Sequence, residues 1–268
     1  MAGESVQPIN ILLSRDELLF ILDALKASFI LGLDTDPMGD RDQEQQSLAM
    51  MVAGRALRAR GLASILENGQ VAIHNALIAA VGVCAYPQQT VSVYHWPSQE
   101  EFTTRYFAHI RGTEVVAHTR PEDVLHLLSR LPSKDYLVNQ MLQVCEVADT
   151  PPAEAIQVNL PTQEFGQVRL LSQQGNTEDA LGVLTRNGVE SASANSLVTT
   201  LSHAPHVSIV QTLKRQPTGT VEKRECTIIQ NSVHAWLVQP SEQGSTSLAI
   251  NAVSKDTVQG VLAGWLSN

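Results

Sequence analysis

The sequence presents one order of short segments twice, and this repeat constrains the fold more than any other feature. The repeated segments are a helical segment ending at a glycine, two alternating segments, and a segment with an Asp that opens an apolar helix. The matched pairs, in chain order, are 57–62 with 184–189, 91–93 with 207–209, 105–112 with 224–231, and 122–125 with 255–258. Short matches seldom keep their order by chance, so the repeat predicts an internal duplication.

Helical periodicity predicts three helices at the start of the chain. Ser14 and Glu17 have the spacing of a capping box, which predicts a helix over 15–30. A segment rich in Gln, Ala, Leu and Met predicts a second helix over 43–60. Apolar residues at helical spacing predict a third helix over 71–86, which ends before a proline.

Alternating residues then predict strands, and a fourth helix follows them. The strands are expected over 91–96, 104–110 and 113–117, with the last two forming a hairpin. A proline at the first position and an apolar stripe behind it predict that the fourth helix spans 121–131.

The second half is expected to repeat this arrangement. It adds one alternating segment over 247–253 before a final helix that Ser254 caps. The proline-rich segment 148–153 is typical of a linker. Together these elements predict an α+β fold with an antiparallel sheet, helices and quasi-two-fold symmetry. We expect a single domain over 1–268 that is built of two similar halves, about 1–150 and 151–268.

Charge and composition exclude several classes of partner. The 268 residues carry a formal net charge of −9, so we expect no surface that tracks phosphates and no nucleic-acid partner. The longest apolar run, over 71–86, is shorter than the ~20 residues that cross a bilayer, so we expect no membrane insertion. The first residues lack a signal-peptide pattern, and Cys84, Cys145 and Cys226 indicate buried free thiols. These features favour a cytoplasmic protein.

No common catalytic or nucleotide-binding signature occurs in the sequence. The acidic segment 34–45 partly follows a calcium loop, but Met38 and Gln45 stand where two of the ligands are needed. We therefore interpret it as a solvated acidic loop that caps the next helix. His203 and His206 could bind zinc, but no Cys, Asp or Glu lies within eight residues of them. We expect no metal and no cofactor.

One pair of histidines could carry acid–base chemistry. His109 and His118 lie on neighbouring predicted strands, where they could be cross-strand neighbours. No nucleophile motif lies near them, so we expect no catalytic residue in this protein.

Several segments, taken in chain order, resemble those of a known family. They are the Ser14 and Glu17 cap, the helix end Ala-Arg-Gly-Leu at 59–62, the Pro-flanked centre, the segment 156–161, and the alternating pair 227–229 and 233–237. Together these segments resemble the EspG family, cytoplasmic chaperones of bacterial type VII (ESX) secretion, over most of the chain. The resemblance implies an α+β fold with quasi-two-fold symmetry, in agreement with the repeat.

The resemblance also implies a function. It implies a chaperone or adaptor that binds the helical tip of an aggregation-prone secreted protein, a heterodimer in the best-known systems, and that catalyses no reaction. Two alternatives stay open: an unrecognised small-molecule enzyme and a regulatory protein-interaction module. Neighbouring genes for small helical secreted proteins and a membrane ATPase would favour the chaperone.

The resemblance further implies where a partner binds. In the family the contacts come from loops of the sheet and from the C-terminal helical region, which here correspond to 97–103, 216–223 and the closing helix. The expected partner-binding residues are Trp96, Phe102, Val258, Val261 and Leu262. Aromatic anchors commonly supply much of the binding energy at such surfaces. The closing helix also carries Trp265. These side chains could instead pack the protein's own core, above all Leu262 and Trp265.

Overall fold

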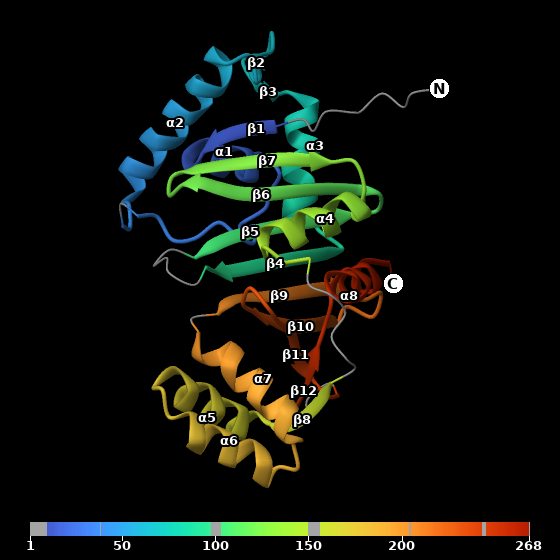
Figure 1. The fold of residues 1–268 in the computed structure, drawn as a ribbon. Coiled ribbons are helices and arrows are strands. Elements are labelled where there is room, and N and C mark those ends of the chain that lie inside the picture. Colours follow the sequence, from blue (N-terminus) through green and yellow to red (C-terminus); the bar gives the residue numbers. More distant parts are fainter. Residues whose placement is uncertain are drawn as a thin grey trace. The chain divides into compact units, whose positions relative to one another are not determined.

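The computed structural model describes residues 10–37, 39–97, 103–149, 156–203, 205–242 and 245–267. The first half contains β1 (Asn10–Ser14), α1 (Arg15–Ala24), α2 (Gln43–Ala59), β2 (Ala63–Ile65), β3 (Val71–Ile73), α3 (Asn75–Ala85), β4 (Gln89–Trp96), β5 (Thr104–Arg111), β6 (Glu114–Glu122), β7 (Leu125–Leu131) and α4 (Lys134–Val144). The second half contains β8 (Gln157–Pro161), α5 (Thr162–Gln173), α6 (Thr177–Arg186), α7 (Ser191–Ser202), β9 (His206–Arg215), β10 (Val221–Gln230), β11 (Ala235–Pro240), β12 (Ser247–Ala252) and α8 (Lys255–Ser267). Helices and antiparallel strands form the α+β fold that the sequence predicts (Figure 1).

The two halves contain their elements in the same order. Each half begins with a strand that leads directly into a helix, continues with further helices, and ends with four strands and a closing helix. Within the described residues, the β2–β3 hairpin of the first half has no counterpart in the second. This order is the one expected of a duplicated chain, and the duplication itself stays a prediction.

The chain divides into two compact units. The first comprises the described residues of Met1–Val91, Tyr106–Leu137 and Leu213–Glu222, and the second those of Ser92–Arg105, Val138–Thr212 and Lys223–Asn268. In the first unit, β1, β7, β6 and β5 are hydrogen-bonded in that order as antiparallel pairs. In the second, β10, β11, β12 and β8 follow one another in the same way. Each unit therefore draws segments from both halves of the sequence.

Helix α1 begins where the sequence predicts and ends earlier. The Glu17 N–H donates to Ser14 Oγ at 3.2 Å, and the Ser14 N–H donates to Glu17 Oε2 at 2.8 Å, so the expected capping box is present. The helix ends at Ala24 instead of at residue 30, because Lys26 adopts a φ of 58°. A left-handed residue just beyond a helix closes it.

Helix α2 confirms its prediction almost to the residue. Asp42 caps it, because Asp42 Oδ1 accepts a hydrogen bond from the Gln45 N–H at 2.8 Å. The third predicted helix is wrong in its first turn, since Val71–Ile73 forms strand β3 and α3 begins only at Asn75. Pairing of β3 with β2 explains the difference, because β-branched residues favour such a hairpin.

The helix predicted over 121–131 is wrong. Strand β6 continues to Glu122, and Leu125–Leu131 forms β7. The apolar residues of this segment fit either period, and the strand wins because β7 pairs with β1 on one side and β6 on the other. Pro121 is tolerated because the β6–β7 register shifts between Thr119 and Glu122.

The closing helix of the first half is α4, which the sequence analysis did not predict. Ser133 caps it by accepting a hydrogen bond from the Tyr136 N–H at 3.1 Å. The match of 122–125 with 255–258 therefore does not hold, because only 255–258 opens a helix.

The end of the chain follows its prediction. Strand β12 and helix α8 lie where they are expected, and Ser254 Oγ accepts a hydrogen bond from the Thr257 N–H at 3.3 Å. The linker expected at 148–153 falls outside the described residues from 150 onward.

The core of the first unit joins α1, α2 and α3 to the strands. Helix α1 contacts α2, α3 and β7, and α3 contacts β6 and β7. The most buried residues of this core include Leu13, Leu18, Ile21, Leu22, Leu57, Leu77, Val81, Val116 and Leu128. Full burial of such a side chain contributes about 1.5–3 kcal/mol, so this cluster holds the unit together.

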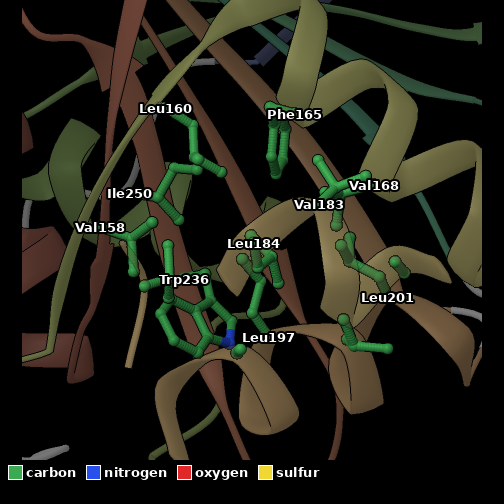
Figure 2. Packing of buried hydrophobic residues seen from close by; sticks show 14 of the residues in the cluster. Val158, Leu160, Phe165, Val168, Val183, Leu184, Leu197, Leu201, Trp236 and Ile250 are labelled. Carbon is green, nitrogen blue, oxygen red and sulfur yellow. The ribbon is translucent and has the colours of Figure 1, made fainter. Parts of the chain in front are cut away.

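The core of the second unit lies between strands β8 to β12 and the packed helices α5, α6 and α7 (Figure 1). Figure 2 shows the indole of Trp236 among aliphatic side chains of this cluster, and Trp236 is fully buried. The three cysteines are free and buried, as predicted. Within the described residues, every helix is too short or too polar to span a bilayer.

Candidate functional site

The second unit contains a groove of about 330 Å³ with mostly apolar walls. Its lining residues are Trp96, Arg169, Gln173, Leu201, Pro205, Val207, Ile209 and Ile229. They come from the end of β4, from helices α5 and α7, from strands β9 and β10, and, for Pro205, from the segment just before β9. The groove is therefore built where helices meet those residues of three strands that belong to the second unit.

Strand geometry explains why these side chains share the groove. Val207 and Ile209 are two residues apart on β9, and alternate residues of a strand point to the same face. Trp96 ends β4, is 36% exposed and stacks on Tyr94, with ring centroids 6.3 Å apart. The indole is therefore held in place while part of it faces solvent.

Polar groups enter the groove from helix α5. Arg169 and Gln173 are four residues apart, so they lie one above the other on one face of the helix, and both are exposed. The groove thus combines an apolar surface with one cationic and one amide side chain.

The five residues predicted to bind a partner occupy different environments. Val258 and Leu262 are fully buried on α8, and Val261 is half-buried. Trp96 is exposed at the groove, whereas Phe102 lies outside the described residues. Of the four that lie within the described residues, only Trp96 lines the groove. The sequence did not indicate the lining residues of β9, β10 and α5. The one available signal was the alternation of β9, which places Val207 and Ile209 on the same face of the strand.

The acidic segment 34–45 carries its own cationic partners. Asp34 forms an ion pair with Arg120, and Asp36 lies 3.0 Å from an Arg41 guanidinium nitrogen. Asp42 serves as the cap of α2. These pairings agree with the interpretation as a helix-capping loop, and Met38 lies outside the described residues.

Three histidines lie in the interior of the first unit. His109, His118 and His126 are at most 1% exposed, and His118 Nε2 lies 2.9 Å from His126 Nδ1. Burial lowers the pKa of His109 and of His126 to about 3 and the pKa of His118 to about 4. These side chains are therefore neutral and inaccessible at neutral pH, which favours packing over acid–base chemistry.

A second cluster of polar groups lies in the second unit. His95, Glu146 and His206 bring three potential metal-ligand atoms within 4.8 Å of one another. The sequence marks His206 as a candidate ligand, but His95 and Glu146 lie too far from it along the chain for their spacing to indicate a shared site. The fold therefore assembles a group of donors that local spacing could not reveal.

An exposed aromatic side chain at an apolar groove defines a surface suited to binding another protein. The EspG family model matches residues 14–262, so the chain belongs to the EspG family. This match confirms the expectation of a type VII secretion chaperone. No curated protein matches the chain.

A solved structure supports the same fold. The chain is similar to the Mycobacterium tuberculosis type VII secretion system chaperone EspG5, whose structure was determined in complex with a PE25–PPE41 dimer. The two chains are 17% identical with a TM-score of 0.65, over 95% of this chain and 94% of that one. At this identity the similarity establishes likeness of fold.

Proposed function

We propose that this protein is a cytoplasmic chaperone whose groove in the second unit binds the helical tip of a secreted substrate. Membership of the EspG family supports the chaperone role. The observation that carries the location is the partly exposed indole of Trp96 beside the apolar residues of β9 and β10.

The chemistry of the groove suits the tip of a helix. Burying one Leu or Phe side chain of a partner against Trp96, Val207 and Ile209 would contribute about 1.5–3 kcal/mol. The last carbonyls of a helix have no partner inside the helix, and Arg169 and Gln173 are donors that could satisfy them. The groove thus offers an apolar surface for the side chains of such a tip and hydrogen-bond donors for its last carbonyls.

The substrate we propose is a secreted helical heterodimer of the kind that EspG5 binds in its PE25–PPE41 complex. Binding would keep the apolar surface of the substrate from aggregating until export. We propose further that the protein catalyses no reaction, because Arg169 is the one titratable side chain among the described residues that line the groove. Phe102 and Val261 stay candidate contacts, whereas Val258 and Leu262 have no exposed surface to offer in this structure.

Capture from the native cytoplasm, followed by titration of the purified captured heterodimer, tests the proposal. Trp96→Ala should weaken binding by more than about 1 kcal/mol while the melting temperature stays nearly unchanged. Val207→Asp should weaken it more strongly, because it places a charge in the apolar wall.

Leu170→Ala is the matched control. Leu170 is 55% exposed and lies next to Arg169 on α5, but it does not line the groove. Its truncation should leave the affinity unchanged. Equal affinities for the wild type and both groove variants would place the binding site elsewhere, and capture of no secreted helical protein would overturn the chaperone proposal itself.

A further inference from the structure

The cluster of His95, Glu146 and His206 has the geometry of a metal site. Glu146 Oε2 lies 3.6 Å from His95 Nε2 and 3.2 Å from His206 Nδ1. A tetrahedral zinc ion bound at about 2.0–2.2 Å keeps its ligand atoms roughly 3.3–3.5 Å apart. Both distances are therefore close to those that one shared ion requires.

The residue types point to a particular class of ion. Two imidazole nitrogens and one carboxylate oxygen form a ligand set that zinc sites with an open fourth position use. Hard ions such as Mg²⁺ prefer oxygen ligands, so nitrogen donors select a borderline transition metal. The cluster is also accessible, because the Glu146 side chain is 55% exposed and that of His206 is 34% exposed.

Neighbouring groups hold the ligands in place. Ser208 Oγ lies 2.8 Å from His95 Nδ1, on the opposite side of the ring from Nε2. A hydrogen bond at Nδ1 fixes the ring and directs the Nε2 lone pair toward an ion, which is the usual support of a ligating histidine. His95 itself is 2% exposed, so its ring is anchored in the interior while the other two ligands face solvent.

A second support holds the backbone at Glu146. The Gln230 amide nitrogen donates to the carbonyls of Cys145 and Glu146 at 2.8 and 3.0 Å. Glu146 also adopts a φ of 51°, a left-handed conformation that strains the backbone of a residue with a side chain. Gln230 is 3% exposed, so this contact fixes the segment that presents the carboxylate from within the unit.

We propose that His95 Nε2, Glu146 and His206 Nδ1 bind one Zn²⁺ ion. Each ligand comes from a different element: His95 from β4, His206 from β9, and Glu146 from the segment after α4. Because neighbouring residues of a strand point to opposite faces, the ion lies on the other face of β4 and β9 from Trp96 and Val207. It joins these two strands to the segment after α4 without occupying the groove, and the proposal does not depend on the function of the groove.

Calorimetric titration of the tag-free, chelator-treated full chain with zinc sulfate tests the proposal. The expected result is one zinc ion per chain, a higher melting temperature at micromolar zinc, and no response to Mg²⁺. Cobalt bound in place of zinc should give the visible absorption of a near-tetrahedral site. Glu146→Gln and His206→Ala alter partly exposed side chains, and each should weaken zinc binding by more than about 10-fold.

His203→Ala is the matched control, because His203 is exposed, lies three residues from His206 and does not belong to the cluster. The His203→Ala variant should bind zinc with the same affinity as the wild type. Ser208→Ala should weaken binding by about 10-fold through the orientation of His95. Failure of the wild type to bind zinc at micromolar concentration, or retention of full affinity in either ligand variant, would overturn the proposal.

Discussion

Trp236 Nε1 donates a hydrogen bond to Thr200 Oγ1 at 3.2 Å inside the core of the second unit, where both side chains are fully buried. Thr200→Val keeps the shape of the side chain and removes the acceptor. Because a buried donor without a partner costs about 1–3 kcal/mol, the free energy of unfolding should fall by that amount. Urea denaturation measures the change. Thr200→Ser keeps the hydroxyl and should lose less, so equal losses in the two variants would contradict the role of this hydrogen bond.

The buried histidines should make stability depend on pH. In the unfolded chain they titrate near 6.5, whereas burial lowers the folded pKa of His109 and of His126 to about 3 and that of His118 to about 4. Below pH 6.5 the unfolded chain therefore binds more protons than the folded one. The free energy of unfolding decreases as the pH is lowered from 6.5 to the folded pKa values. For each pH unit that the pH is lowered between 6.5 and the folded pKa, each histidine should reduce the free energy of unfolding by up to about 1.4 kcal/mol.

Urea denaturation at several pH values between 7.5 and 5 checks this dependence. Carboxylates add their own dependence at acidic pH, so the informative quantity is the difference between the wild type and His126→Gln. The variant should lose stability less steeply between pH 6.5 and 5. A variant with the same slope as the wild type would show that His126 does not resist protonation.

Gly32 should tolerate no larger side chain. It has a φ of 94°, and an added Cβ would lie 2.7 Å from Phe107 Cδ2 and 2.8 Å from His118 Nδ1. Gly32→Ala should therefore combine backbone strain with overpacking and lose about 2–4 kcal/mol of stability. Gly39→Ala is the control, because Gly39 has a φ of 83° and nothing within 4 Å of an added Cβ. It should lose only about 1–2 kcal/mol in the same denaturation experiment.

The duplication predicts that the two halves superpose. In chain order, β1 with α1 corresponds to β8 with α5, strands β4 to β7 correspond to β9 to β12, and α4 corresponds to α8. One rotation should bring the Cα atoms of 91–131 onto those of the matching strands within 207–266, the same spans that the sequence repeat indicates, and a crystal structure of the chain measures this superposition. Different strand connections in the two spans would end the argument for duplication.

Local signals in the sequence predicted correctly where several helices begin, but they predicted the wrong secondary structure for the segment 121–131. Ser14, Asp42 and Ser254 cap helices where a side-chain oxygen can accept from the first free N–H groups, and this preference acts within a few residues. The segment 121–131 was predicted as a helix because its apolar spacing fits two periods, and only pairing with β1, over a hundred residues away, selects the strand. Helix α4 was missed together with it.

The candidate site was predicted only in part for the same reason. Trp96 was identified as a binding residue from its sequence, but its neighbours in the groove come from helices and strands far along the chain. Val258 and Leu262 have apolar side chains of the kind that also occur on binding surfaces, and only the packing of the folded chain buries them.

The sequence by itself determined the family, the α+β class and the helix caps, because these depend on residue type and short spacing. The tertiary structure decided which apolar side chains are buried, which strand replaces a helix, and which histidine meets Glu146. Burial and long-range pairing are properties of the folded chain, and residues that meet across it need no recognisable spacing along it.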